Sequence, residues 1–432
     1  MIIAACGSDS GDASLDASTD RGVIIQPPDQ DDPIVDPATL RPIVITGVDY
    51  ACAILEDRSV RCWGSNADGQ LGNPQIADLP DGGYTFDSRP VAFPQRAAIT
   101  EVGTLSSGGL VFPPFGTDVQ TGCAVRSDKH VHCWGSDESA ALGRGSASED
   151  ANLSKRPHPE PQPVTGLPPS EQVVTSGYFS CALSTLAVRC WGGNDDDNKW
   201  SANSPKKVTS PVEIALPSRR SAKQLAIGTS HICALLDDAH VACWGSNLSG
   251  QLGTSAASPN PTPTVVPGIE NVVELKAASG ITCVRTVAGE VQCWGANGNG
   301  RLGRGPMDAS QSSTPAPVAL PEGSRARQIS VGEHHVCAIL QDRTVWCWGN
   351  NELGGLGSGN TDGKTMVPSE SSIPIAVQGL PTGALYVSVG GGFTCATLAD
   401  YSVTCWGSNR FGTLGRGTID TSPHPEPARV NF

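Results

Sequence analysis

The sequence has little charge and no long apolar run, and each of these deficits excludes a class of protein. Charged residues make up 17% of the chain and hydrophobic residues 38%, which is typical of a globular protein rather than of a disordered one. No apolar run approaches the ~20 residues that a membrane-spanning helix needs. Glycine and proline supply 50 and 34 of the 432 residues, and helix interiors exclude both. A mostly β protein is therefore predicted.

Positive charge is scarce, because the chain has 29 Lys and Arg but 43 Asp and Glu, which gives a net charge of −14. An acidic surface without a basic stripe repels phosphate backbones, so nucleic acid is not an expected partner. Part of the acidity lies in residues 7–32, which hold seven Asp and one Arg. This stretch has almost nothing to bury and is predicted to be a flexible tether. Proteins or polysaccharides are the expected partners.

Signature motifs of common enzymes are missing as well. The chain has no Gly-x-Ser-x-Gly, phosphate loop or His-Glu-x-x-His, and its eight His are scattered. His130 and His132 could begin a metal site, and the acidic residues 195–198 could bind calcium. Solvated surface is the favoured interpretation of both, and of His334 and His335. No catalytic residue, metal or cofactor is predicted.

The fifteen cysteines divide into the solitary Cys6 and seven regular couples. Each second cysteine of a couple opens a Cys-Trp-Gly tripeptide and follows a valine two residues earlier, so the chain is a seven-fold repeat. Six couples are ten residues apart and one is nine. The couples are Cys52 with Cys62, Cys123 with Cys133, Cys181 with Cys190, Cys233 with Cys243, Cys283 with Cys293, Cys337 with Cys347 and Cys395 with Cys405.

Each couple is predicted to pin a β-hairpin with a disulfide. Folding the first unit around Asp57 places Cys52 opposite Cys62, and opposed residues have Cβ atoms roughly 4.5–5.5 Å apart. The shorter third unit keeps this register if its deletion lies in the turn at residues 184–187. Structural zinc sites favour cysteines two to four residues apart, whereas the cysteines of these couples are nine or ten residues apart. Buried free thiols remain the alternative.

A second signature, Asn-x-x-Gly-Gln-Leu-Gly, follows Cys-Trp-Gly, as in residues 66–72 and 247–253. Its leucine is interpreted as a core residue and its glycines as turn positions. Each repeat also has two further strand-like segments, one that begins at a proline and one that precedes the next cysteine. Each repeat is therefore predicted to contain about four short strands. Seven such units predict an all-β, seven-bladed β-propeller over residues 33–432.

These recurring positions resemble the repeats of the regulator of chromosome condensation, whose members form seven-bladed propellers. The resemblance covers residues 33–432, because the same positions recur in all seven units. The paired cysteines depart from the eukaryotic pattern and look like those of secreted or surface bacterial members. The family includes a guanine-nucleotide exchange factor, a light receptor and a secreted β-lactamase inhibitor, so the resemblance does not fix the function.

The two ends of the chain carry separate expectations. Residues 424–430 repeat residues 158–164, which predicts terminal-strand ring closure: a last strand, extending through residues 428–432, in a blade whose other strands lie elsewhere in the sequence. Ile34-Val35 is the rival for that role.

At the N-terminus, Ile3-Ala4-Ala5-Cys6 matches a lipobox. Residues 1–6 are interpreted as a truncated lipoprotein signal, with Cys6 lipidated as the only membrane contact and the protein in the cell envelope or extracellular. Only five residues precede Cys6, whereas an export signal needs a charged segment and 7–15 apolar residues. Secretion without lipid and a cytosolic protein with a chance match therefore stay open.

Departures from the repeat supply the candidate binding residues, because loops on a rigid scaffold commonly carry function. An apolar insert at residues 103–116 contains Phe112 and Phe115, and Trp200 stands where another repeat has glycine. A loop tucked against its own blade is the alternative. The sequence thus predicts a monomeric, non-catalytic scaffold for a protein or polysaccharide partner. A secreted enzyme inhibitor is the second hypothesis and an exchange-factor-like regulator the third.

Overall fold

The computed structural model describes residues 42–74, 84–91, 99–101, 120–145, 157–185, 187–195, 200–305, 311–359 and 369–430. The chain divides into two units, Met1–Ile34 and Val35–Phe432, and every described residue belongs to the second. The predicted signal at residues 1–6, the predicted tether at 7–32 and Cys6 lie outside the described residues. Among the described residues, no helix has the length and apolar character needed to cross a membrane.

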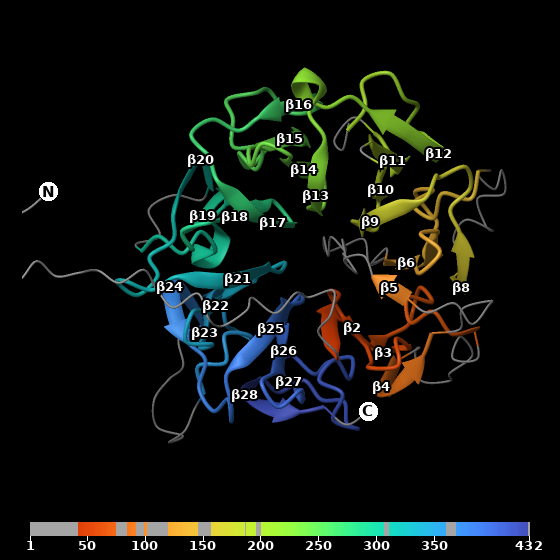
Figure 1. Cartoon of the computed structure of the whole chain (residues 1–432). Coiled ribbons are helices and arrows are strands. Elements are labelled where there is room, and N and C mark those ends of the chain that lie inside the picture. The colour runs from red at the N-terminus through yellow and green to blue at the C-terminus, as the bar shows by residue number, and fades with distance from the viewer. Residues whose placement is uncertain are drawn as a thin grey trace, which may run out of the picture. The chain divides into compact units, whose positions relative to one another are not determined.

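Within the described residues, the strands form seven four-stranded antiparallel sheets around a common centre (Figure 1). These sheets are the blades, numbered in chain order. Their strands are β1 (Ile43–Thr46), β2 (Tyr50–Ile54), β3 (Val60–Ser65) and β4 (Tyr84–Pro90); β5 (Ile99–Glu101), β6 (Thr121–Arg126), β7 (Val131–Gly135) and β8 (His158–Pro163); β9 (Ser170–Thr175), β10 (Phe179–Ser184), β11 (Ala187–Gly193) and β12 (Lys207–Ile214); β13 (Ala222–Ile227), β14 (His231–Leu236), β15 (Val241–Gly245) and β16 (Asn260–Val265); β17 (Val272–Ala278), β18 (Ile281–Thr286), β19 (Val291–Ala296) and β20 (Gln311–Pro317); β21 (Ala326–Val331), β22 (His335–Leu340), β23 (Val345–Asn350) and β24 (Glu370–Ala376); β25 (Ala384–Val389), β26 (Phe393–Leu398), β27 (Val403–Gly407) and β28 (His424–Arg429).

The seven-bladed propeller predicted from the repeat is confirmed, with one repeat per blade. The first strand of each blade is innermost and the fourth forms the outer edge (Figure 1). Two short 3-10 turns, η2 (Pro217–Arg219) and η3 (Gly298–Gly300), lie within the described residues. Every fully described outer strand carries at least one proline, as in β8 and β28. Proline lacks an N–H, so it blunts an edge that would otherwise pair with another chain.

The predicted disulfides are present in all seven blades, where each joins the second strand to the third. The bonds join Cys52 with Cys62, Cys123 with Cys133, Cys181 with Cys190, Cys233 with Cys243, Cys283 with Cys293, Cys337 with Cys347 and Cys395 with Cys405. All fourteen cysteines are buried, with at most 1% of their surface exposed. The alternative of buried free thiols is therefore not the arrangement in this structure.

The two cysteines of each couple are direct partners across the ladder, with Cα atoms 4.0–4.1 Å apart. In the shorter third unit, Cys181 still faces Cys190. The deletion is absorbed in the turn, where Thr185 has a φ of 23°. The register predicted from the cysteine spacing thus holds in the short repeat as well.

Adjacent blades are joined by the tryptophan of the Cys-Trp-Gly motif. In six blades its indole Nε1 donates to a backbone carbonyl in the loop that follows the third strand of the preceding blade. The pairs are Trp63–Thr413, Trp134–Gln70, Trp191–Ala141, Trp294–Gln251, Trp348–Arg301 and Trp406–Gly355, at 2.8–2.9 Å. We call each of these contacts a blade joint. Nε1 of Trp244 has no acceptor among the described residues, and residues 196–199 of the neighbouring loop lie outside them.

The Leu-Gly of the second signature builds the other half of the blade joint. The leucine side chain is buried, as Leu71 is, and its backbone N–H donates to the side chain of Asn66 at 3.0 Å. Gly72 has a φ of +68°, and a Cβ there would lie 3.0 Å from the indole Nε1 of Trp134. Only glycine tolerates both the left-handed backbone and this close approach. The two sequence signatures are therefore complementary parts of one interface.

The ring closes differently from the sequence prediction. The terminal strand β28 does complete the last blade, but its partners are β25–β27, which directly precede it in the chain. It is simply the fourth strand of its repeat, as β8 is in blade 2, so it does not tie distant parts of the chain into one blade. Closure comes from the joint of blades 7 and 1, through Trp63 and a bond from Thr46 N to Ser388 Oγ at 3.0 Å. The rival Ile34-Val35 and residues 431–432 lie outside the described residues.

Replacing Trp63 by Phe should test this closing joint, with Trp134→Phe as its matched control. Each change leaves one buried carbonyl without its donor, so each should lower the free energy of unfolding by about 1–3 kcal/mol. Urea unfolding followed by circular dichroism measures both values. A loss for Trp134→Phe with none for Trp63→Phe would contradict closure through the joint of blades 7 and 1.

The disulfides predict a sharp alkylation pattern. In guanidinium without reductant, iodoacetamide should label none of the fourteen paired cysteines, because none of them carries a free thiol. After reduction under the same conditions, all fourteen should react, as counted by mass spectrometry. Labelling of any couple before reduction would show free thiols at that hairpin.

Candidate functional site

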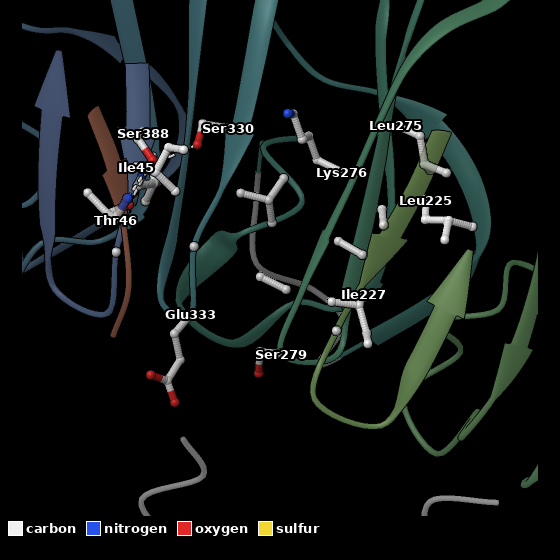
Figure 2. Close-up of a pocket in the computed structure, with 18 of the residues that line it drawn as sticks. Ile45, Thr46, Leu225, Ile227, Leu275, Lys276, Ser279, Ser330, Glu333 and Ser388 are labelled. Carbon is white, nitrogen blue, oxygen red and sulfur yellow. Dashed lines mark hydrogen bonds between the residues drawn. The ribbon is translucent and has the colours of Figure 1, made fainter. Parts of the chain in front are cut away.

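A cavity of about 110 Å³ lies between the innermost strands of six blades. Its lining comes from β1, β9, β13, β17, β21 and β25 and from the short loops that follow several of them. Figure 2 draws most of these residues. We call it the central cavity. The labelled lining residues are Ile45, Thr46, Leu225, Ile227, Leu275, Lys276, Ser279, Ser330, Glu333 and Ser388.

Side-chain amides tie the walls of the central cavity together. Gln172 accepts from the N–H of Leu225 in the next blade at 2.7 Å and donates to the carbonyl of the same residue at 3.1 Å. Gln328 makes the same pair of bonds to Val387, at 2.8 and 2.9 Å. An innermost strand would otherwise present unpaired backbone groups. The amide of each glutamine thus bonds the backbone groups that a neighbouring strand would otherwise pair.

Elsewhere in the ring, hydroxyl groups and one carboxylate form similar hydrogen bonds between neighbouring blades. Ser330 Oγ accepts from Val389 N at 3.0 Å. In blade 5 the bridging residue is Glu274, which accepts from Ile329 N at 3.2 Å and pairs with Arg285 Nε at 2.9 Å. Buried polar groups of this kind are costly unless they are paired. Much of the polar character of the cavity is thus used to hold the blades together.

The remaining side chains of the central cavity do not form a reactive constellation. Its described lining has one lysine, Lys276, one glutamate, Glu333, and one tyrosine, Tyr386, and contains no arginine or histidine. Among the described residues, no group of three or more His, Cys, Asp or Glu is placed to hold a metal ion. No reaction is derived from this set of side chains.

Trp200, predicted as a partner-binding anchor, is buried, and this prediction is wrong. None of its surface is exposed, its indole N–H donates to the carbonyl of Gly193, and its ring stacks on Phe179 with centroids 6.2 Å apart. Its backbone N–H donates to Asn194 Oδ1 at 3.0 Å, as the leucine N–H does in other blades. Trp200 therefore fills the core where the third unit has lost its Gln-Leu-Gly. Phe112, Phe115 and residues 196–198 lie outside the described residues.

The predictions for the histidines also need correction. His130 is exposed in the turn before β7, whereas His132 is buried with its Nε2 3.3 Å from Arg126 Nη1, so the two do not form a common surface site. His335, predicted at the surface, has 1% of its surface exposed. His231 is buried at the equivalent place in blade 4. Burial lowers the pKa of each of these two imidazoles to about 3.

The burial of His231 and His335 had a signal in the sequence. Both stand two residues before the first cysteine of their unit, where other units have Tyr50, Phe179 and Phe393. A position that is aromatic in three repeats of a β-propeller is a packing position, and the repeat alignment would have placed both histidines in the core.

An RCC1-like domain model matches residues 119–432, and an RCC1 repeat model matches residues 46–70. The chain belongs to the RCC1-like domain family. It is 32% identical to the ultraviolet-B receptor UVR8 of Arabidopsis thaliana over 219 residues, which are 50% of this chain and 48% of that protein. It is 26% identical to protein pim1 of Schizosaccharomyces pombe over 321 residues, 69% of this chain and 59% of that protein.

The fold is shared with solved RCC1-type propellers. Prp20p of Saccharomyces cerevisiae superposes with a TM-score of 0.73 at 20% identity, over 91% of this chain and 88% of that chain. The chain spans about half of UVR8 and 59% of pim1.

Replacing Trp200 by Ala should test its role in the core of blade 3. Removal of a fully buried indole should lower the free energy of unfolding by about 3–5 kcal/mol. Tyr401→Ala is the matched control, because Tyr401 is 58% exposed and should cost less than about 0.5 kcal/mol. Urea unfolding of the two variants decides the point, and equal stability would mean that Trp200 is not a core residue.

Proposed function

We propose that this RCC1-like propeller is a non-catalytic scaffold that binds a protein partner outside the reducing cytosol. The observation that carries the proposal is the distribution of the polar and apolar groups. Many of the polar groups around the central cavity form hydrogen bonds between blades, whereas large apolar side chains are exposed on loops. Loops on a rigid scaffold are a common place for recognition.

The loops between the third and fourth strands supply the proposed binding surface. In an antiparallel blade these loops lie at the same end as those between the first and second strands, and we call this end the loop face. Leu248 is 70% exposed and Leu353 39% exposed on it, and Arg410 lies 5.4 Å from the ring centroid of Phe411. Exposed aliphatic and aromatic side chains beside arginine are typical of protein interfaces.

The apolar insert belongs to the same proposal. It connects β5 to β6, the first and second strands of blade 2, so both of its attachment points are at the loop face. Phe112 and Phe115 are proposed as further anchors for the partner.

The proposed compartment rests on the disulfides. Disulfides persist in oxidising environments, and seven buried pairs suggest an extracellular or envelope location. We propose in addition that Cys6, the one cysteine without a couple, is lipidated and anchors a bacterial envelope protein.

Relatives support a role in binding without naming the partner. UVR8 is an ultraviolet-B receptor, and the structure of Prp20p is described with its binding to Gsp1p and histones. Because Prp20p binds proteins, a protein partner is the feature that we carry over.

Capture from intact envelope fractions should identify the partner and its surface together. Wild-type protein should retain a partner that the Leu248→Ser/Leu353→Ser variant loses at least tenfold. Val287→Ser is the matched control, because Val287 is 73% exposed in a turn between the second and third strands, at the opposite end of the blade. Equal capture by all three proteins, or loss only with Val287→Ser, would contradict binding at the loop face.

A further inference from the structure

Two of the blade joints contain a buried histidine. His231 Nε2 in blade 4 lies 2.8 Å from Thr282 Oγ1 in blade 5, and His335 Nε2 in blade 6 lies 2.7 Å from Thr394 Oγ1 in blade 7. The exposed fractions of the two histidines are 0% and 1%. Each imidazole therefore links its own blade to the next one in the ring.

Each histidine is connected, through the threonine that it contacts, to the hydrogen bond of the tryptophan in the same blade joint. Thr282 Oγ1 donates to the carbonyl of Gln251 at 2.9 Å, and the same carbonyl accepts from Trp294 Nε1 at 2.9 Å. The joint of blades 6 and 7 has the same design, with Thr394 and Trp406 both donating to the carbonyl of Gly355 at 2.9 Å.

This geometry assigns the protonation state of the imidazoles. Because each threonine gives its proton to a carbonyl, its oxygen must accept from the histidine Nε2–H. The neutral ring then has a bare Nδ1. In His231 this atom is buried and has no hydrogen-bond partner among the described residues. A proton added there would carry a charge into the joint with no acceptor to receive it.

Few charges act on these two rings. The strands around His231 carry Lys223 on β13, Glu274 and Lys276 on β17 and Arg285 on β18, but burial alone lowers the pKa of His231. His335 is affected by burial first and then by its neighbour His334, which lies near Arg301 and Glu352. No carboxylate is among the causes of the pKa shift of either buried ring.

The other blades have no titratable histidine at this place. The equivalent residues are Tyr50, Thr121, Phe179, Ile281 and Phe393. The hydroxyl of Tyr50 also reaches the next blade, 3.4 Å from the carbonyl of Thr121, but it is neutral in mild acid. Sensitivity to mild acid at this position is thus confined to two of the joints.

We propose that the joints of blades 4 and 5 and of blades 6 and 7 form a pH-sensitive device whose opening mild acid promotes, while it leaves the other joints of the ring unchanged. An opened joint exposes the imidazole to water and lets it bind a proton at its ordinary affinity.

The sign of the effect follows from proton linkage. The closed joint holds each histidine with a pKa of about 3, against 6.5 when exposed, so the open state binds more protons between these values. Above pH 6.5 both states are neutral and the histidine has no effect. Below it, opening is favoured by about tenfold for each pH unit, or about 100-fold at pH 4.5, and the effect levels off near pH 3.

Hydrogen exchange on the intact protein measures this opening at matched backbone amides. The N–H of Leu275 donates to Gln224 across joint 4–5, that of Val387 to Gln328 across joint 6–7, and that of Leu225 to Gln172 across joint 3–4. From pH 7 to pH 4.5, after correction for intrinsic exchange, protection should fall about 100-fold at Leu275 and Val387 and change little at Leu225. An equal change at all three amides, or none, would overturn the proposal.

Substitutions make the test specific to each histidine. His231→Phe installs the residue that blades 3 and 7 carry naturally, and His231→Gln keeps a donor for Thr282 without titrating. Either variant should abolish the pH effect at Leu275 and leave that at Val387 intact, while His335→Phe should do the reverse. The control His240→Gln, at a half-buried turn histidine, should leave both effects unchanged. A pH effect at Leu275 that survives both His231 variants would contradict the assignment.

Discussion

The hydrogen bond from a tryptophan indole to a loop carbonyl of the preceding blade is the interaction on which the ring depends. Each blade is a small sheet that cannot bury both of its faces alone, so its stability comes from neighbours. The indole fills the space between two blades and its N–H satisfies a buried carbonyl, as Trp134 does with Gln70. Because Trp63 makes the same contact with Thr413, the first and last repeats meet as five other pairs of neighbouring blades do.

The disulfides and the tryptophans act on the same hairpin. The cystine joins the second and third strands of each blade, and the tryptophan follows the second cysteine directly. A fixed register at the cystine therefore fixes the direction in which the indole leaves the strand. The covalent bond shapes each blade, while the indole and the Gln-Leu-Gly loop join one blade to another. This division explains why both signatures recur together.

The register of each hairpin could be predicted from the sequence, whereas the predictions for Trp200, His335 and the closure of the ring were wrong. The spacing of Cys52 and Cys62 predicts the hairpin, and the short turn of the third unit predicts its preserved register, because both depend on neighbouring strands. The burial of Trp200 comes from contacts within blade 3, with Phe179 and Gly193, at a place where the third unit departs from the repeat. The burial of His335 had a signal in the aromatic residues of other repeats, so an alignment of the repeats predicts it. Ring closure depends on the first and last blades together, so the repeated terminal segment wrongly predicted a strand in a blade whose other strands lie elsewhere in the sequence. Sequence alone singled out Phe112 and Phe115, whose role remains a proposal.

Exchange of the indole N–H of Trp63 with deuterium, followed by NMR, tests the closed ring most directly. If Trp63 donates to Thr413 in a joint equivalent to the others, its indole N–H should be protected to the same degree as that of Trp134, within about tenfold. Exchange of the Trp63 proton at the rate of an exposed indole, with Trp134 still protected, would mean that the ring is open between blades 7 and 1.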